Sequence, residues 1–129
     1  MTTNFSSEIK AYVEKAEESL EISKRLLKDH YFDVSASRSY YAAFYVIAAL
    51  LLMKGNKYRK HSAVISFFHK EFIKTGELDK EYGKNLNWLF NLRGIGDYNV
   101  KIHVTVDEAR EAVRVAEKFI TAIKGMIEK

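Results

Sequence analysis

Hydrophobic residues along this chain recur every three or four positions, which is the period of an amphipathic α-helix. Apolar positions within residues 6–29 fall on one helix face, and residues 40–53 are apolar on every side. Further stripes with helical spacing occupy residues 60–74, begin again near residue 79, and begin once more at residue 105. The pattern therefore predicts about five helices, the second of which is covered all round by its own bundle or by a second subunit.

Turn and capping residues mark the expected ends of these helices. We expect Asp33 to be the N-cap of the second helix, and Gly55 and Gly76 to follow the ends of the second and third. Residues 105–108 read Thr-Val-Asp-Glu, a capping box that starts the last helix. The chain has no proline, and only residues 101–106 alternate like a strand. We therefore predict an all-α, up-and-down helical bundle that forms a single domain over residues 1–129.

Composition places the chain among ordinary globular proteins. Hydrophobic residues make up 47% and charged residues 29% of its 129 residues, and there is no cysteine, which rules out disulfides and thiolate metal sites. The four histidines lack the spacing of metal ligands, so we expect neither metal nor cofactor. No signal peptide is recognisable, and the apolar run at residues 40–53 is shorter than the ~20 residues of a membrane span. These features predict a cytoplasmic protein without a membrane partner.

Positive charge is concentrated in one segment. The net charge is +4, but residues 54–74 alone carry +5. This segment sets six basic residues against Glu71: Lys54, Lys57, Arg59, Lys60, Lys70 and Lys74. Such a patch is typical of proteins that bind polyanions such as nucleic acid. A solvated loop and helix face explains the charge slightly better when charge is considered alone.

The segment NLRGIGDYNV, residues 91–100, carries the first candidate site. The apolar stripe of the fourth helix continues into Arg93 and, four residues later, Asp97. Arginine stays protonated in proteins and needs an anion or water, so Arg93 either forms a structural ion pair with Asp97 or joins Asp97 and Tyr98 in an anion-binding site. The two nearby glycines indicate either a helix end at Gly94 or the close approach of a ligand or another backbone.

Two other positions add to this site. Arg38 precedes the apolar run of the second helix and shares a face with Tyr41. Arg38 either pairs with Asp97 across the bundle or converges with Arg93, in which case phosphate is the natural ligand. Lys60 and His61 open the third helix, where the helix N-terminus favours a bound anion, although histidine at such a position is more often a surface or capping residue.

Three segments of the chain resemble the HEPN domain family, and the small stand-alone prokaryotic branch most of all. They read SRSYYAAFYVIAALLL, KHSAVISFFHKEFIKTGEL and LFNLRGIGDY, and the resemblance extends from about residue 8 to residue 125. It implies a helical up-and-down bundle that dimerises through the helices bearing the motifs, and an action on RNA. In some members it implies a minimal nucleotidyltransferase as the partner in a toxin–antitoxin system.

The resemblance also assigns residues. Active members are metal-independent endoribonucleases with an Arg-x4-6-His motif, and Arg93 matches its arginine. The histidine should then stand at positions 98–100, which hold Tyr98, Asn99 and Val100, while His103 lies too far along. Tyrosine has a pKa near 10 and is a poor base at neutral pH. The resemblance further matches Arg38, Tyr41 and His61 to residues of the family's second and third helices.

We therefore expect a homodimeric module that binds RNA or a nucleotide. Its expected ligand contacts are Arg38, Tyr41, Lys60, His61, Arg93, Asp97 and Tyr98, and the second helix is expected to supply the dimer face. The alternative is a metal-independent endoribonuclease, a toxin, in which Arg93, His61 and Tyr98 are catalytic. A third reading is a structural partner that only docks another protein.

Overall fold

The computed structural model describes residues 3–57 and 60–128, with side chains from residue 6 onward, and it is helical throughout. The elements, in order, are α1 (Thr3–Lys28), α2 (Phe32–Met53), α3 (His61–Phe68), the π-helix η1 (His69–Ile73), α4 (Lys80–Tyr98) and α5 (Val106–Ile127). No strand occurs within these ranges, and residues 101–106 form part of a connection and the first residue of α5. The predicted all-α bundle is confirmed.

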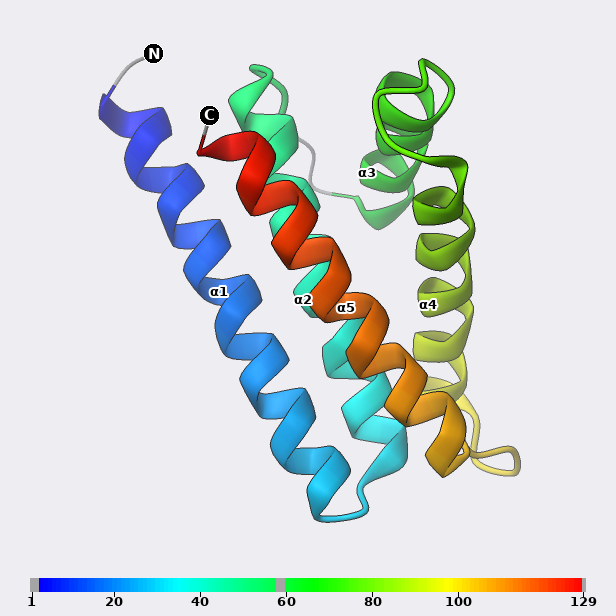
Figure 1. Ribbon diagram of the computed structural model, residues 1–129. Helices are drawn as coiled ribbons and strands as arrows, with labels where there is room; N and C mark the ends of the chain where they lie inside the picture. The colour runs from blue at the N-terminus through cyan, green and yellow to red at the C-terminus, as the bar shows by residue number, and fades with distance from the viewer. Residues whose placement is uncertain (1–2, 58–59, 129) are drawn as a thin grey trace.

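Helix α2 lies at the centre of the bundle. It packs against α1, α4 and α5, and α5 also packs against α1. In Figure 1, α5 crosses in front of α2, while α3 and α4 lie together on the right. The α1–α2 and α4–α5 connections meet at the lower end of that view. This end holds the C-terminus of α4, where Arg93, Asp97 and Tyr98 are located.

The apolar side chains of α2 are covered by its own bundle. Tyr40, Val46, Ile47 and Leu50 are fully buried. By length and composition α2 could cross a membrane, but 72% of its most apolar window is buried within the protein, as in a core helix. The apolar run therefore needs no second subunit to cover it, and the expectation that it supplies a dimer face loses its original reason.

The helix boundaries confirm the predicted capping box and the start of the fourth helix near residue 79, and they correct two other expectations. Asp79 caps α4 by accepting a hydrogen bond from Glu81 N, and the Thr105–Glu108 capping box is complete. Asp33 is not the N-cap of α2, because the helix already begins at Phe32 and the Asp33 carboxylate is engaged elsewhere. The predicted third helix is also interrupted, since its second half is the π-helix η1.

The two glycines near the C-terminal end of α4, Gly94 and Gly96, have different surroundings. A Cβ at Gly96 would lie 2.5 Å from the Asp33 carbonyl oxygen, so only glycine lets α4 approach the first turn of α2 this closely. A Cβ at Gly94 would meet nothing within 4 Å. Helix α4 also continues through Gly94 to Tyr98. The backbone that comes close to Gly96 therefore belongs to the same chain. Of these two glycines, only Gly94 leaves space that a ligand or another backbone could enter.

We expect the two glycines to respond oppositely to alanine. Gly96→Ala should lower the thermal unfolding temperature, because its methyl group would clash with a backbone carbonyl that cannot move alone. Gly94→Ala should raise stability by up to about 1 kcal/mol, because alanine is the better helix former and the space is open. Thermal denaturation of both variants measures this, and equal shifts for the two would contradict the packing described.

Candidate functional site

The Arg93 guanidinium is enclosed by aromatic rings. Its Cζ lies 5.4–5.7 Å from the ring centroids of Tyr40, Tyr41, Phe90 and Tyr98. Only 15% of the side chain is exposed. Aromatic faces attract a cation electrostatically, more strongly when water is excluded, so the rings partly replace the hydration that Arg93 loses. The guanidinium is therefore held in place and reaches solvent over a small area.

Two polar groups complete the surroundings of Arg93. Its Nη2 donates a hydrogen bond of 3.1 Å to the Tyr41 hydroxyl, and its Nε lies 3.1 Å from Asp97 Oδ2. The Nε contact is an ion pair without hydrogen-bond geometry, which leaves this buried N–H without a hydrogen-bond acceptor among the described residues. The i, i+4 ion pair considered from the sequence is therefore present, but Asp97 does not use the full donor capacity of the guanidinium.

These contacts also keep the guanidinium charged. Burial tends to lower the pKa of Arg93, but the hydrogen bond to Tyr41 and the nearby Tyr41, Tyr98 and Asp97 groups outweigh it, and the net pKa is raised. Arg93 is thus a permanent positive charge at the surface end of the aromatic cluster.

Arg38 approaches the same tyrosine from α2. Its Cζ lies 6.0 Å from the Tyr41 ring centroid, compared with 5.6 Å for Arg93. No ion pair of Arg38 with a carboxylate occurs among the described residues, so Arg38 does not pair with Asp97. Arg38 and Arg93 thus both lie near the Tyr41 ring, and their convergence on a phosphate stays a prediction.

His61 joins this cluster through Tyr40, a residue that sequence reasoning missed. The Tyr40 hydroxyl lies 2.8 Å from His61 Nδ1, and the His61 ring stacks on Phe44 with centroids 4.2 Å apart. Tyr40 is fully buried, and burial, only partly opposed by Arg93, raises the pKa of its hydroxyl. Its proton therefore stays on the oxygen, and because His61 Nδ1 is the ring nitrogen within hydrogen-bond distance, we infer that the hydroxyl donates to Nδ1. The second ring nitrogen, Nε2, must then carry the hydrogen when His61 is neutral.

The same surroundings disfavour a charged imidazole. Burial lowers the pKa of His61, and the positive charge of Arg93 lowers it further. His61 is thus neutral at pH 7 and carries one N–H group, at Nε2, that Tyr40 does not occupy. This arrangement suits the donation of a hydrogen bond to an anion better than the removal of a proton.

The remaining predicted residues lie at the margin of the cluster. Tyr98 is 72% exposed, with its ring over Arg93. Lys60 is exposed at the N-cap position of α3, next to His61. In the basic segment, Lys57 pairs with Glu8, and Lys54 lies over the Phe72 ring. Arg59 falls outside the described residues.

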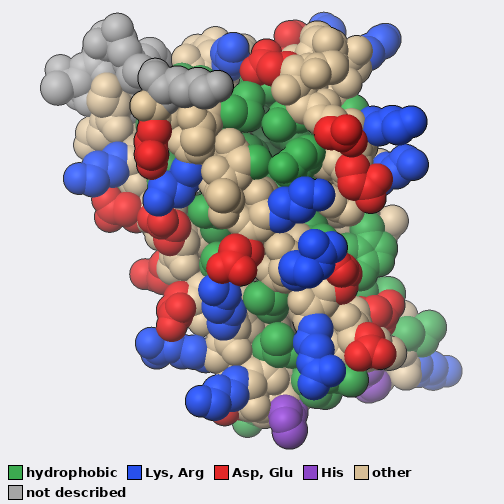
Figure 2. All heavy atoms as spheres, viewed as in Figure 1, with side chains coloured by type: hydrophobic (Ala, Val, Ile, Leu, Met, Phe, Trp, Pro, Cys, Tyr) green, Lys and Arg blue, Asp and Glu red, His purple; other side chains and the backbone are tan. Residues whose placement is uncertain are grey.

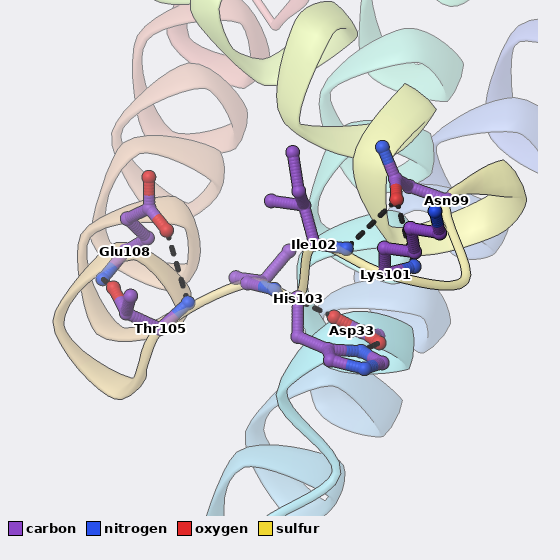
Figure 3. Close-up of polar contacts among 8 residues, drawn as sticks. Asp33, Asn99, Lys101, Ile102, His103, Thr105 and Glu108 are labelled. Atoms are coloured by element: carbon purple, nitrogen blue, oxygen red, sulfur yellow. Dashed lines mark hydrogen bonds and ion pairs between the residues drawn. The ribbon is translucent and has the colours of Figure 1, made fainter.

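Figure 3 shows how the connection after α4 is fastened to α2. Asp33 Oδ1 accepts a hydrogen bond of 2.7 Å from Val104 N, and Asp33 Oδ2 lies 2.8 Å from His103 Nδ1. The Asn99 side chain accepts hydrogen bonds from the backbone N–H groups of residues 101 and 102. These contacts fix the end of α4 that carries Asp97 and Tyr98. They also occupy His103, the histidine that follows the expected motif position.

Other features of the described residues add no second chemical site. No group of three or more His, Asp or Glu side chains in them is arranged to hold a metal ion. A hollow beside the α4–α5 connection is lined by Tyr31, Val34 and His103 and does not include Arg93. The hollow also includes Asp33, whose carboxylate is already engaged by His103 and Val104.

The three segments that resemble the HEPN domain family all lie within the part of the chain that the family model matches. The family model of the HEPN domain matches residues 9–126. A UPF0332 protein from Thermotoga maritima is 41% identical over 88% of this chain and 86% of its own length. A Methanocaldococcus jannaschii protein, named "Putative toxin MJ0142", is 39% identical over 96% of this chain and 84% of its own.

A solved structure shares the fold at low sequence identity. TT1696 from Thermus thermophilus aligns with a TM-score of 0.80 over 92% of this chain and 97% of its own, at 17% identity. The helical arrangement is thus found in a protein whose sequence has diverged widely.

We expect NMR to find His61 protonated at Nε2 and not at Nδ1. The Tyr40 hydroxyl donates to Nδ1, and this favours one tautomer. Long-range ¹H–¹⁵N correlations of the imidazole at pH 7.5 distinguish the two forms. Tyr40→Phe removes the donor and should give a mixture of tautomers. A protonated Nδ1 in the unmodified protein would contradict the proton assignment.

We also expect His61 to make stability depend on pH. Because its pKa in the folded protein is lowered, the unfolded chain takes up a proton first as the pH falls below about 6.5. The free energy of unfolding should therefore be highest above pH 6.5 and decrease below it. Urea denaturation at pH 7.5 and 5.5 should show a smaller decrease for His61→Gln than for the unmodified protein. Equal decreases would contradict the lowered pKa.

Proposed function

The chain belongs to the HEPN domain family, and from this premise we propose that it is a module that binds RNA or a nucleotide through the residues around Tyr41. The observation that carries the proposal is the placement of two guanidinium groups, from Arg38 and Arg93, against one tyrosine ring. Both groups are positive charges near the same ring, so together they favour the binding of an anion. One of them has no carboxylate partner among the described residues, and phosphate matches the geometry of guanidinium donors.

Each residue of the site has a distinct part in this proposal. Arg38 contacts a phosphate directly, and Arg93 adds charge from within its aromatic surroundings. His61 donates a hydrogen bond from Nε2, and Lys60 adds an exposed positive charge beside it. Tyr98 is exposed enough to stack on a base, a contact that contributes about 1–3 kcal/mol in comparable proteins. Asp97 orients Arg93 and at the same time competes with the ligand for its charge.

The contact between Tyr40 and His61 favours binding over catalysis. RNA cleavage without a metal needs a base to take the 2′-hydroxyl proton. With Nδ1 accepting from Tyr40, the nitrogen left for a ligand already carries a hydrogen. Tyr98, at the position expected for the motif histidine, is a poor base. The proposal is therefore a binding module, and the endoribonuclease is the alternative that a cleavage assay tests.

We propose a homodimer that forms at the end of the bundle where α4 terminates. Besides Tyr98, the large exposed hydrophobic side chains of the described residues lie near this end: Tyr31, Val34, Val100 and Ile102. A partner surface would cover apolar area here that water otherwise contacts.

Two relatives from Methanocaldococcus jannaschii carry names of the form "Putative toxin". We therefore propose a cytoplasmic toxin–antitoxin-type role with a minimal nucleotidyltransferase as partner.

We expect short single-stranded RNA to bind in a salt-dependent manner, and Arg38→Gln and Arg93→Gln to weaken it. Each variant should reduce the slope of log affinity against log salt by about 0.7, the value for one phosphate contact on a single strand. Asp97→Asn should strengthen binding, because it removes a competing negative charge. Fluorescence anisotropy with labelled RNA measures all of these. Arg114→Gln is the control, because Arg114 pairs with Glu111 on α5.

Two outcomes would overturn the proposal. Salt-independent binding, or none, would favour a protein that only docks another protein. RNA cleavage that persists in the presence of a chelator and is lost in His61→Gln would establish the endoribonuclease instead.

A further inference from the structure

A row of tyrosines extends from the Tyr41 site to helix α1. The Tyr41 and Tyr45 ring centroids are 6.2 Å apart with planes at 33°, and those of Tyr45 and Tyr12 are 6.5 Å apart with planes at 30°. All three side chains are half-buried, so each ring keeps part of its surface in solvent. The three rings follow one another at nearly equal steps and tilts, across the contact between α1 and α2. We call Tyr12, Tyr45 and Tyr41 the tyrosine row.

Positive charge lies beside two of the three rings of the row. Lys15, one turn after Tyr12 on α1, places its Nζ 5.4 Å from the Tyr45 ring centroid. Arg38 and Arg93 lie beside Tyr41. Lys15 is exposed, and no ion pair of Lys15 occurs among the described residues. Two consecutive rings of the row are thus each flanked by at least one cation.

We propose that the tyrosine row and Lys15 form a second subsite, which binds further nucleotides of a single-stranded RNA whose first phosphate occupies the Tyr41 site. This proposal rests on the proposed function and specifies its ligand as an oligonucleotide instead of a mononucleotide. Proteins that bind single strands combine aromatic rings, on which successive bases stack, with cations that follow the phosphates. Regularly spaced rings with cations beside them supply both features.

The simpler interpretation is that the tyrosines only seal the contact between α1 and α2. The opposite side of α1 shows what such a contact looks like in this protein. There, Lys24 pairs with Glu117 at 2.8 Å, and Lys124 pairs with Glu17 at 2.9 Å, between α1 and α5. Figure 2 shows acidic and basic side chains interspersed over that face. At the tyrosine row, Lys15 faces the Tyr45 ring and forms no ion pair with an acidic side chain among the described residues. A contact that only seals two helices together needs no cation.

The experiment compares ligand lengths. Binding of UMP, diuridylate and fluorescein-labelled hexauridylate is measured for the unmodified protein, Lys15→Gln, Tyr45→Leu and Arg93→Gln. Tyr45→Leu should weaken hexauridylate binding by about 5- to 150-fold, the range for loss of one stacked base. Lys15→Gln should reduce the salt slope of hexauridylate binding by about 0.7. Neither variant should change the affinity for UMP. Arg93→Gln should weaken all three ligands.

Three controls keep the result specific. Lys24→Gln removes a lysine from the other face of α1 and should leave every affinity unchanged. Tyr45→Phe keeps the ring and should preserve hexauridylate binding, which separates stacking from the hydroxyl group. Thermal denaturation shows whether Tyr45→Leu is folded, and Lys15→Gln, at an exposed position, tests the proposal independently of that variant.

Failure of this proposal is distinguishable from failure of the proposed function. If Arg93→Gln loses hexauridylate while Lys15→Gln and Tyr45→Leu retain it fully, the subsite is wrong and the Tyr41 site remains. If the unmodified protein binds none of the three ligands, both are wrong. If hexaglutamate competes as well as unlabelled hexauridylate, the row is a general surface for acidic chains, including acidic peptides, and the RNA subsite is overturned.

Discussion

Burial of helix α2 is the constraint on which the rest of this structure depends. Thirteen of its 22 residues are buried, and α1, α3, α4 and α5 all pack against it. Polar side chains of α2 that cannot be buried must then lie along the part that the other helices leave uncovered. Arg38, Tyr41 and Tyr45 are spaced three and four residues apart and share that part. Because the apolar side of α2 must be covered, its polar and aromatic side chains form a stripe on the less covered side.

The position of Arg93 follows from the same constraint. Helix α4 packs against α2 with Leu86, Leu89 and Leu92 buried, and Arg93 comes one turn after Leu89 on that side. A charge brought so close to the core loses hydration. Without compensation, this lost solvation would cost several kcal/mol of stability. Aromatic faces, the Tyr41 hydroxyl and Asp97 provide that compensation. Because Asp97 makes an ion pair without a hydrogen bond, the guanidinium is stabilised but not saturated.

A single buried hydroxyl links the core to the chemistry of the site. Tyr40 belongs to the core by burial, yet its oxygen meets His61 on α3. Through that contact the core sets which imidazole nitrogen carries the hydrogen, and hence whether His61 donates or accepts toward a ligand. The departure from the family's Arg-x4-6-His motif and this tautomer have the same effect, since both remove a proton acceptor from the site. The placement of protons on His61 and Tyr98 is therefore what separates the proposed binding module from the alternative endoribonuclease.

The sequence by itself determined the helices and the residue types of the site, because helical periodicity and caps such as Asp79 and Thr105 are local properties. It also brought Arg93 and Asp97 together, since residues four apart share a helix face. Tertiary structure alone decided that Arg38 and Arg93 lie near the same tyrosine ring, that Tyr40 contacts His61, and that Gly96 adjoins the Asp33 carbonyl. Each of these depends on how two helices are rotated about their own axes. That rotation is set by the packing of many side chains at once, and no spacing along one segment contains it.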